Sequence, residues 1–257
     1  MKQVGDISVE LNDYVAVVEI RRPPYNYFDK ELIGDLASVF EELDADKNCR
    51  ASVLAAEGKA FCAGAVFQTP IDVDKRVADA KVLYAEAVRL FRLKKPIIGA
   101  VDGAAIGGGL GLALVPDFRV TCPEARFAAN FTKIGIHPGF GLTLTLPHLI
   151  GQQKASLMFF TGMRIKGDQA FEWGLADQLT ERVDVRNKAV ELATEIANSA
   201  PLAIQSTRKA LRADLVRQIS GRTDHELAEQ KILFATQDFV EGVASVRDRR
   251  VGLFNEE

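Results

Sequence analysis

Cysteine and histidine are scarce in this chain of 257 residues, which has three of each. Cys49, Cys62 and Cys122 are odd in number and lack CxxC spacing, so neither a disulfide framework nor a zinc knuckle is indicated. The motifs HExxH and GxSxG are also absent, which leaves zincins and α/β-hydrolases without a supporting motif. We therefore expect a protein of a reducing compartment with no metal site.

An excess of one charge and long hydrophobic runs are lacking as well. The formal net charge is −3, and no long basic stripe is interleaved with aromatic residues, which argues against nucleic acid as a ligand. No stretch reaches the length of a membrane span without a charge or a breaker, and residues 1–13 lack the pattern of a targeting segment. We expect a cytoplasmic protein that binds neither nucleic acid nor membranes.

Hydrophobic residues make up 47% of the chain, enough for a large domain with a helical extension. Periodicity predicts strands at 7–10, 15–20, 52–55, 97–101, 117–121, 126–128 and 176–179, and helices at 30–46, 77–93, 110–114, 142–162, 168–174, 185–199, 201–215, 223–235 and 239–249. Residues 69–75 lack periodicity and are interpreted as a mobile lid. A composition shift near residue 200 predicts a core of residues 1–200 and a helical region of residues 201–257.

Two loops of small residues each lie between a strand-like and a helix-like run. They are residues 60–65 (AFCAGA) and residues 106–111 (IGGGLG). Two such loops can direct two backbone N–H groups at one oxygen, which is how enzymes hold a developing oxyanion. The glycines do not form the dinucleotide fingerprint GxGxxG, because the fifth residue after Gly107 is Leu112. Close packing of a helix on a strand is the alternative role of these glycines.

The order of these motifs resembles the crotonase (enoyl-CoA hydratase/isomerase) superfamily. The matching segments are GKAFCAGA at 58–65, KPIIGAVDG at 95–103, GGG at 107–109, DFR at 117–119, ARF at 125–127, GI at 135–136, PG at 138–139, TG at 161–162, EG at 241–242, RR at 249–250 and Phe254. The resemblance implies an α/β fold, a crotonase-like spiral of ββα units with a C-terminal helical trimerisation region. It also implies a homotrimer or homohexamer.

The ligand implied by the resemblance is an acyl-CoA thioester, so coenzyme A enters as part of the substrate and no cofactor is bound permanently. The thioester carbonyl oxygen would lie between the N–H of Ala65 and the N–H of Gly108, with Ala63 and Gly64 beside the coenzyme. Removing one such donor typically costs about 3 kcal/mol of transition-state stabilisation.

Two further positions are implied to contact coenzyme A. Gln68 stands where the family often has a lysine, which weakens a phosphate contact there. Arg249 aligns with a basic residue that meets the phosphates, and arginine suits bidentate phosphate binding. The alternative for Arg249 is a solvated helix end.

The acids of the family's hydratases are missing. Hydratases carry glutamates at the positions of Gly111 and Phe131, and several isomerases and aryl-CoA dehalogenases carry a carboxylate at the position of Gly139. Adding water to an enoyl thioester needs one group to deprotonate water and another to deliver a proton to the α-carbon. We therefore expect an acyl-CoA-processing enzyme of the hydratase/isomerase type that retains enolate stabilisation but is not an efficient two-glutamate hydratase.

The sequence does not identify which residue transfers the proton. His137 lies in the glycine-rich turn of residues 135–141 and is a candidate general acid or base, but a loop-fixing role is favoured because the sequence offers it no carboxylate partner. Cys62 as a nucleophile has no base beside it, and a small buried cysteine is the commoner role. The alternative functions are a non-catalytic CoA-thioester-binding homologue and a CoA-thioester hydrolase or decarboxylase.

Overall fold

The computed structural model describes residues 1–67 and 72–256. Its strands are β1 (Lys2–Val4), β2 (Ile7–Asn12), β3 (Val15–Ile20), β4 (Ala51–Ala56), β5 (Ala60–Cys62), β6 (Ile97–Val101), β7 (Ala104–Ile106), β8 (Phe118–Thr121), β9 (Arg126–Ala128), β10 (Arg164–Lys166) and β11 (Gln178–Leu179). Its helices are α1 (Lys30–Ala45), α2 (Val73–Phe91), α3 (Gly108–Ala113), α4 (Leu142–Thr161), α5 (Gly167–Glu172), α6 (Val185–Ala197), α7 (Pro201–Leu211), α8 (Ala213–Leu233) and α9 (Gln237–Arg247), with 3-10 turns η1 (Asn130–Ile134) and η2 (Arg182–Asp184).

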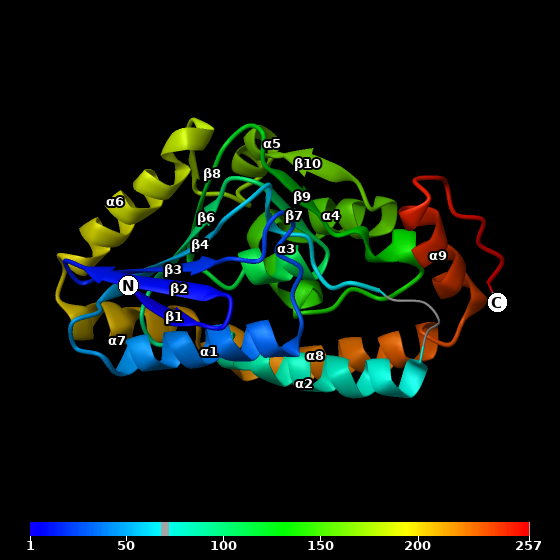
Figure 1. Cartoon of the computed structure of the whole chain (residues 1–257), viewed down its shortest axis with the longest axis horizontal. Coiled ribbons are helices and arrows are strands. Elements are labelled where there is room, and N and C mark those ends of the chain that lie inside the picture. Colours follow the sequence, from blue (N-terminus) through cyan, green and yellow to red (C-terminus); the bar gives the residue numbers. More distant parts are fainter. Residues whose placement is uncertain (68–71, 257) are drawn as a thin grey trace.

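The strands form two sheets, and the chain alternates between them from β4 to β9 (Figure 1). Within the described residues the larger sheet has the order β1-β2-β3-β4-β6-β8-β11, and the smaller has the order β10-β9-β7-β5. Successive units β4-β5-α2 and β6-β7-α3 each place their first strand in the large sheet and their second in the small one, where β4 pairs parallel with β6 and β5 pairs parallel with β7. The α/β spiral of ββα units expected from the resemblance is therefore confirmed.

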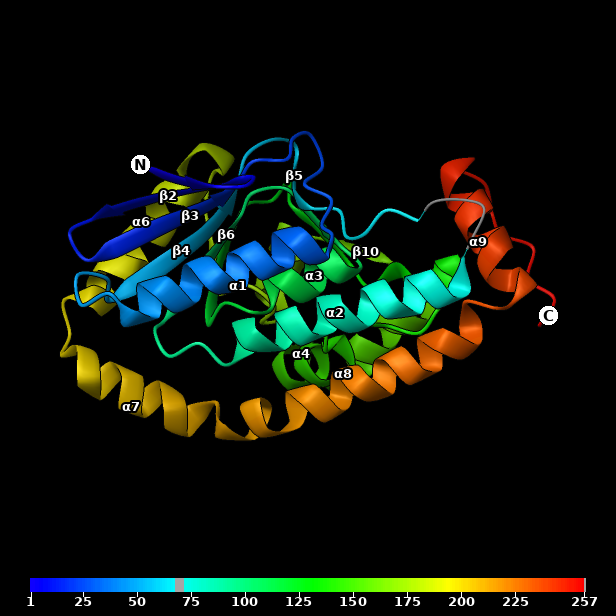
Figure 2. The same ribbon diagram turned by 60° about the horizontal axis from the view of Figure 1, so that its bottom comes forward.

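Helix α1 shows how the sequence builds these layers. Asp29 caps its N-terminus, because Asp29 Oδ1 accepts a hydrogen bond from the N–H of Leu32 at 2.8 Å. Leu32, Leu36 and Leu43 recur at helical spacing and are buried. Helices α1, α2 and α8 run side by side beneath the sheets (Figure 2). None of the helices in the described part of the chain has the length and hydropathy that crossing a membrane requires.

Several predicted elements need correction. The break expected between residues 215 and 223 is wrong, since α8 is continuous and the chain bends at Arg212 instead. The expected helix at 142–162 contains a kink at Gly151, which has φ 79°. Of the expected lid, residues 69–71 lie outside the described residues, whereas residues 73–75 belong to the first turn of α2. The strands β1, β5, β7 and β10 were not predicted, because pairing with other segments, rather than a local pattern, decides them.

A buried ion cluster joins the C-terminal helices to the sheet. The Asp117 carboxylate precedes β8 and accepts hydrogen bonds from Arg208 Nε at 2.9 Å and from Arg212 Nη1 at 2.8 Å. It also accepts one from the N–H of Ile97 at 2.9 Å. The Arg208 side chain is only 8% exposed. The boundary near residue 200 remains a prediction, but Asp117 ties Arg208 on α7 and Arg212, between α7 and α8, to the sheet.

Replacing this carboxylate tests its importance. We expect Asp117→Asn to lower the free energy of unfolding by about 3 kcal/mol, because it leaves buried guanidinium groups without their counter-charge. The matched control is Asp214→Asn, which removes an exposed pair with Arg217 on α8 and should cost less than about 1 kcal/mol. Urea unfolding measures both variants, and equal losses would contradict the role given to Asp117.

Candidate active site

The two small-residue loops touch each other through their backbones. A Cβ placed on Gly109 would lie 2.0 Å from the carbonyl oxygen of Cys62, and one placed on Gly64 would lie 2.9 Å from the carbonyl oxygen of Ile106. Gly64 and Gly107 also have positive φ values of 84° and 57°, a conformation that favours glycine. The glycines therefore serve close packing and loop shape together.

This approach brings two backbone donors to the same place. The Cβ position of Gly64 is 3.5 Å from the nitrogen of Gly108, and Ala65 directly follows Gly64. Within the described residues, neither the N–H of Ala65 nor that of Gly108 donates a hydrogen bond. Both residues are partly exposed, so a ligand can reach them. Two such groups can stabilise an oxygen on which negative charge develops.

Aromatic side chains line the loops. The Phe28 N–H donates to the carbonyl oxygen of Gly64 at 3.0 Å, which holds the Phe28 backbone beside the first loop. Its Cζ lies 2.4 Å from the Cβ position of Gly108. The Phe28 ring in turn lies 5.5 Å from the ring of Phe140. The donors are thus bordered by an apolar wall, in which hydrogen bonds to an oxyanion are strengthened.

The positions that carry acids in hydratases are apolar here. A Cβ on Gly111 would lie 2.7 Å from the Cβ of Phe140, so the Phe140 side chain fills the space. Phe131 lies on η1, is 6% exposed, and its ring lies 3.9 Å from the Cβ position of Gly107. Position 111 therefore has no room for a side chain unless Phe140 moves, and position 131 holds a buried ring.

At the third position, Gly139, side chains from α2 and α8 fill the space that a side chain would take. A Cβ there would lie 1.9 Å from Tyr84 Oη and 2.6 Å from Gln230 Nε2. Tyr84 Oη donates to Gln230 Oε1 at 2.8 Å, and Gln230 Nε2 donates to the carbonyl oxygen of His137 at 2.9 Å. Burial raises the pKa of Tyr84, so the phenol keeps its proton. Sequence reasoning missed both residues, since they lie on α2 and α8.

One buried carboxylate holds the turn that carries these residues. Glu226 lies one helical turn before Gln230, is fully buried and accepts hydrogen bonds from the N–H of Gly141 at 2.7 Å and from Thr143 Oγ1 at 2.6 Å. Burial is the main cause that raises its pKa. Its oxygens are engaged by the turn, so Glu226 positions the wall of the site. In the sequence Glu226 is one polar residue of a predicted helix, and nothing there indicated that it is buried.

His137 lies in the expected turn, but its ring faces α8. Its Nδ1 is 2.7 Å from the carbonyl oxygen of Pro138, and its ring centroid is 5.9 Å from that of the exposed His225. These contacts favour the loop-fixing alternative. For Cys62, complete burial raises the pKa to about 12, so the side chain stays a thiol and matches the structural alternative.

The remaining expected contacts are spread around the loops. The Ala63 N–H donates to the carbonyl oxygen of Tyr25 at 2.9 Å, which fixes the first loop. Arg249 is exposed and follows α9, while the neighbouring Arg250 pairs with Glu241. Gln68 lies outside the described residues. Within the described parts of the chain, no three His, Cys, Asp or Glu side chains are grouped to hold a metal ion.

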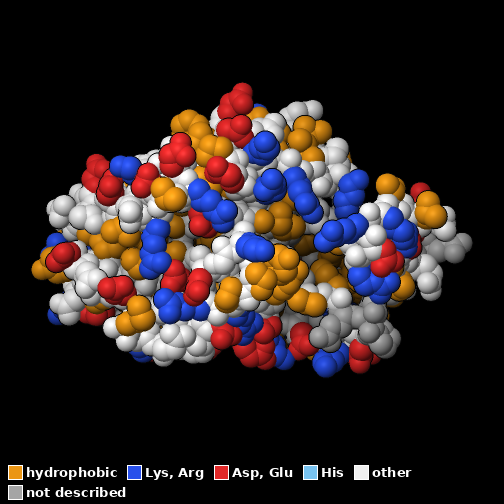
Figure 3. Space-filling model, turned by 45° about the horizontal axis from the view of Figure 1, so that its top comes forward, with side chains coloured by type: hydrophobic (Ala, Val, Ile, Leu, Met, Phe, Trp, Pro, Cys, Tyr) orange, Lys and Arg blue, Asp and Glu red, His pale blue; other side chains and the backbone are white. Residues whose placement is uncertain are grey.

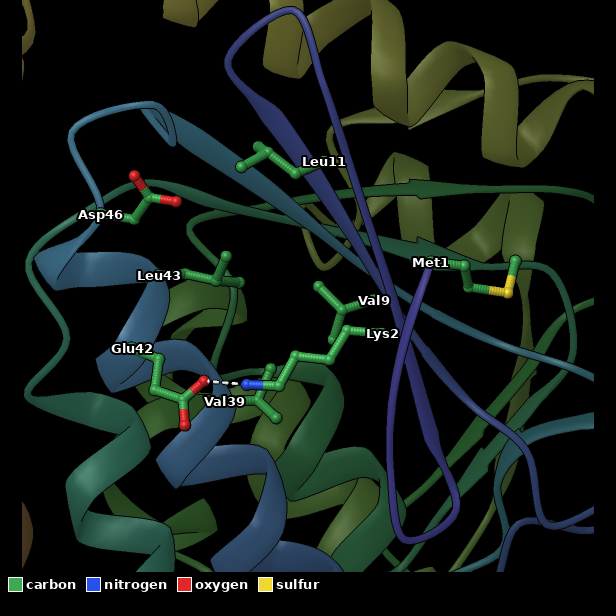
Figure 4. Close-up of a pocket in the computed structure, with 8 residues that line it drawn as sticks. All are labelled: Met1, Lys2, Val9, Leu11, Val39, Glu42, Leu43 and Asp46. Atoms are coloured by element: carbon green, nitrogen blue, oxygen red, sulfur yellow. Dashed lines mark hydrogen bonds and ion pairs between the residues drawn. The ribbon is translucent and has the colours of Figure 1, made fainter.

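A separate hollow lies far along the chain from these loops, between α1 and the β1-β2 hairpin (Figure 4). Val9, Val39 and Leu43 line its floor, and an ion pair between Lys2 and Glu42 crosses it. Both charged side chains are more than half exposed, at 57% and 63%. The hollow's titratable side chains are Lys2, Glu42 and Asp46, of which Lys2 and Glu42 neutralise each other in the ion pair.

Comparisons with known proteins match almost the whole chain. The family model for enoyl-CoA hydratase/isomerase matches residues 10–257. A short-chain-enoyl-CoA hydratase of Clostridium acetobutylicum is 30% identical over 252 residues, covering 96% of this chain and 97% of that protein. A carnitinyl-CoA dehydratase of Proteus mirabilis is 30% identical over 253 residues, covering 95% and 96%.

Solved structures also match the fold over almost the whole chain. A crystal structure of an enoyl-CoA hydratase/isomerase from Pseudoalteromonas atlantica superposes with a TM-score of 0.86 at 26% identity. The match covers 97% of this chain and 100% of that one.

The filled space at position 111 leads to a prediction about packing. We expect Gly111→Glu to lower the free energy of unfolding by about 2 kcal/mol, since its Cβ would overlap Phe140 and overpacking typically costs about 1–3 kcal/mol. Gly221→Glu is the matched control, because no atom lies within 4 Å of a Cβ at Gly221. Thermal and urea unfolding compare the two, and an equally stable Gly111→Glu variant would refute the packing.

Proposed function

Because the chain belongs to the enoyl-CoA hydratase/isomerase family, we propose that it processes an acyl-CoA thioester by stabilising the thioester enolate between the N–H groups of Ala65 and Gly108. The observation that carries this proposal is the contact between the two loops, which leaves both donors without a partner in the described residues and open to a ligand. Ala63 and Gly64 would border the coenzyme.

The chemistry requires little beyond these donors. Removing a proton from the α-carbon moves negative charge onto the thioester oxygen, where both N–H groups are strongest as donors. Each donor contributes about 3 kcal/mol, and the apolar surroundings of Phe28 and Phe140 strengthen the effect. Coenzyme A is supplied with the substrate, and the exposed Arg249 would meet its phosphates.

Efficient hydration does not follow from these residues, because positions 111, 131 and 139 hold no carboxylate. A single proton carrier suffices for exchange or shift of an α-proton. The Tyr84 hydroxyl keeps its proton and occupies the side-chain space of residue 139, so it suits return of a proton to the enolate. Removal of the α-proton falls to His137, the candidate from the sequence, or to water. A non-catalytic CoA-thioester-binding role is the second candidate function, favoured by the apolar residues at the acid positions.

Assembly as a homotrimer or homohexamer is part of the proposal. The C-terminal helices carry large hydrophobic side chains on their outer faces: Leu202 is 79% exposed, Leu211 80% and Ile232 66%. Such side chains on neighbouring helices suit burial against further copies of the chain.

Position 108 offers a test of the oxyanion donor. Proline at the first residue of a helix is tolerated but has no N–H. We expect Gly108→Pro to slow exchange of the α-proton, followed by mass spectrometry of acyl- and enoyl-CoA thioesters in deuterated water, by at least about 100-fold. Gly108→Ala is the control, since its Cβ meets the same Phe28 ring but keeps the N–H. Equal rates in the two folded variants would refute the assignment.

The proton carrier is tested by a second pair of variants. We expect Tyr84→Phe to lower the exchange rate by at least about 100-fold with unchanged thioester affinity. His137→Ala should change the rate less than threefold, because the ring is engaged with Pro138 and His225. Tyr14→Phe, on an exposed tyrosine, is the control. A 100-fold loss confined to His137→Ala would instead assign the proton-transfer role to His137.

If the parent protein exchanges no label but is stabilised thermally by acyl-CoA, the non-catalytic role replaces the catalytic one. Ligand at about 100 times its dissociation constant adds roughly 2.7 kcal/mol to the stability of the folded state. Release of free thiol or of carbon dioxide would point instead to a hydrolase or a decarboxylase.

A further inference from the structure

Arg76 on α2 lies among three aromatic rings. Its guanidinium carbon is 4.9 Å from the ring centroid of Phe67 and 5.7 Å from those of Phe234 and Phe239. The rings also contact one another, with centroids 5.6 Å apart for Phe67 and Phe239 and 5.1 Å apart for Phe234 and Phe239. Three segments of the chain thus converge on one cation: the first loop, the end of α8 and the start of α9.

This cation has no counter-charge in the described part of the chain. Arg76 Nε is buried without a hydrogen-bond partner among those residues, and burial lowers the Arg76 pKa. The nearest carboxylate to influence it, Asp79, is already paired with Lys30 Nζ at 2.6 Å. Aromatic faces attract a guanidinium, but they do not replace the hydrogen bonds that water or a carboxylate would give. A ligand that brings an anionic oxygen would complete the site.

The rings connect Arg76 to the proposed oxyanion site. Phe67 follows Ala65 by two residues, which limits their separation to about 7 Å along the backbone. On the other side, Phe239 lies against the turn after η1, since a Cβ on Gly135 would lie 3.0 Å from the Cα of Phe239. That 3-10 turn carries Phe131, which lines the second loop. Aromatic residues therefore lie both beside the donors and around Arg76, and two short segments of the chain connect the two groups.

The surface has a matching shape. Figure 3 shows this side of the molecule hollowed beside the α9 end, with hydrophobic side chains inside the hollow and Lys and Arg side chains along its border. An apolar chain entering from the donors would meet rings first and a cation afterwards.

We propose that Arg76 binds a carboxylate on the acyl group, so that the preferred substrates are CoA thioesters of dicarboxylic acids with short carbon chains. The inference rests on the proposed function, because it assumes that the thioester lies at Ala65 and Gly108. A carboxylate on the acyl group fits the lining better than a coenzyme phosphate, because rings on three sides suit a carbon chain and penalise the burial of a doubly charged phosphate. In ring-lined surroundings a single charge pair is worth more than at the surface.

The test compares thioesters that differ only in the distal charge. We expect the parent protein to bind succinyl-CoA and glutaryl-CoA at least about tenfold more tightly than butyryl-CoA and valeryl-CoA in isothermal titration calorimetry. Arg76→Gln should abolish this preference while changing the dissociation constant of butyryl-CoA less than threefold. Arg76→Lys should retain part of it, because the charge remains and the planar fork is lost.

Arg50→Gln is the matched control, since Arg50 also stacks on an aromatic ring, 3.7 Å from the Tyr14 centroid, but lies beside the carbonyl oxygen of Ala197. It should keep the full preference. Thermal unfolding of each variant verifies that it is folded.

Three outcomes would overturn the inference, and they differ from one another. Equal binding of charged and uncharged thioesters by the parent contradicts the role of Arg76 alone. A loss in Arg76→Gln that is the same for all four thioesters, and that disappears with the corresponding phosphate-free pantetheine thioesters, assigns the guanidinium to the coenzyme phosphates. A parent that binds none of the thioesters contradicts the proposed function, and the inference with it.

Discussion

The close contact between the backbones of residues 62–64 and 107–109 is the constraint on which the rest of the site depends. A single added carbon at Gly109 would overlap the carbonyl oxygen of Cys62, so the loops can meet only where one of them has no side chain. Because they meet, two N–H groups from different ββα units face one place, and the spiral supplies a pair of donors that neither unit has alone. The parallel pairing of β5 with β7 sets this juxtaposition.

Much of the fold was predictable because its signals are local. The cap at Asp29, the apolar spacing of α1 and the β-branched runs of β3 and β6 each lie within one element. The loop residues at 64 and 108 were identified for the same reason, since small residues between a strand and a helix form a contiguous pattern. The strands β1, β5, β7 and β10 and the course of α8 were not predicted, because contacts with other segments decide them.

The side chains that shape the pocket were the least predictable part. Tyr84 and Gln230 are 146 positions apart, and no periodicity in either helix indicates that both reach Gly139. The same holds for Phe140, whose ring takes the space beside Gly111. The sequence indicates that the acids are absent, but only the structure indicates what fills their places. The result is a wall of rings and one phenol where the family's hydratases have carboxylates, with a cation set beyond it.

Glu226 and Gln230 hold the turn at 137–143 by hydrogen bonds, and both residues are synthesised late. The loops that carry the donors are complete once residue 113 has been synthesised, yet the wall opposite them is held by residues more than a hundred positions later. On the ribosome, where folding proceeds from the N-terminal side, the spiral can form while its pocket is still open. The wall of the candidate site is therefore completed only once α8 has been made, and a nascent chain that ends before α8 lacks the residues that hold it.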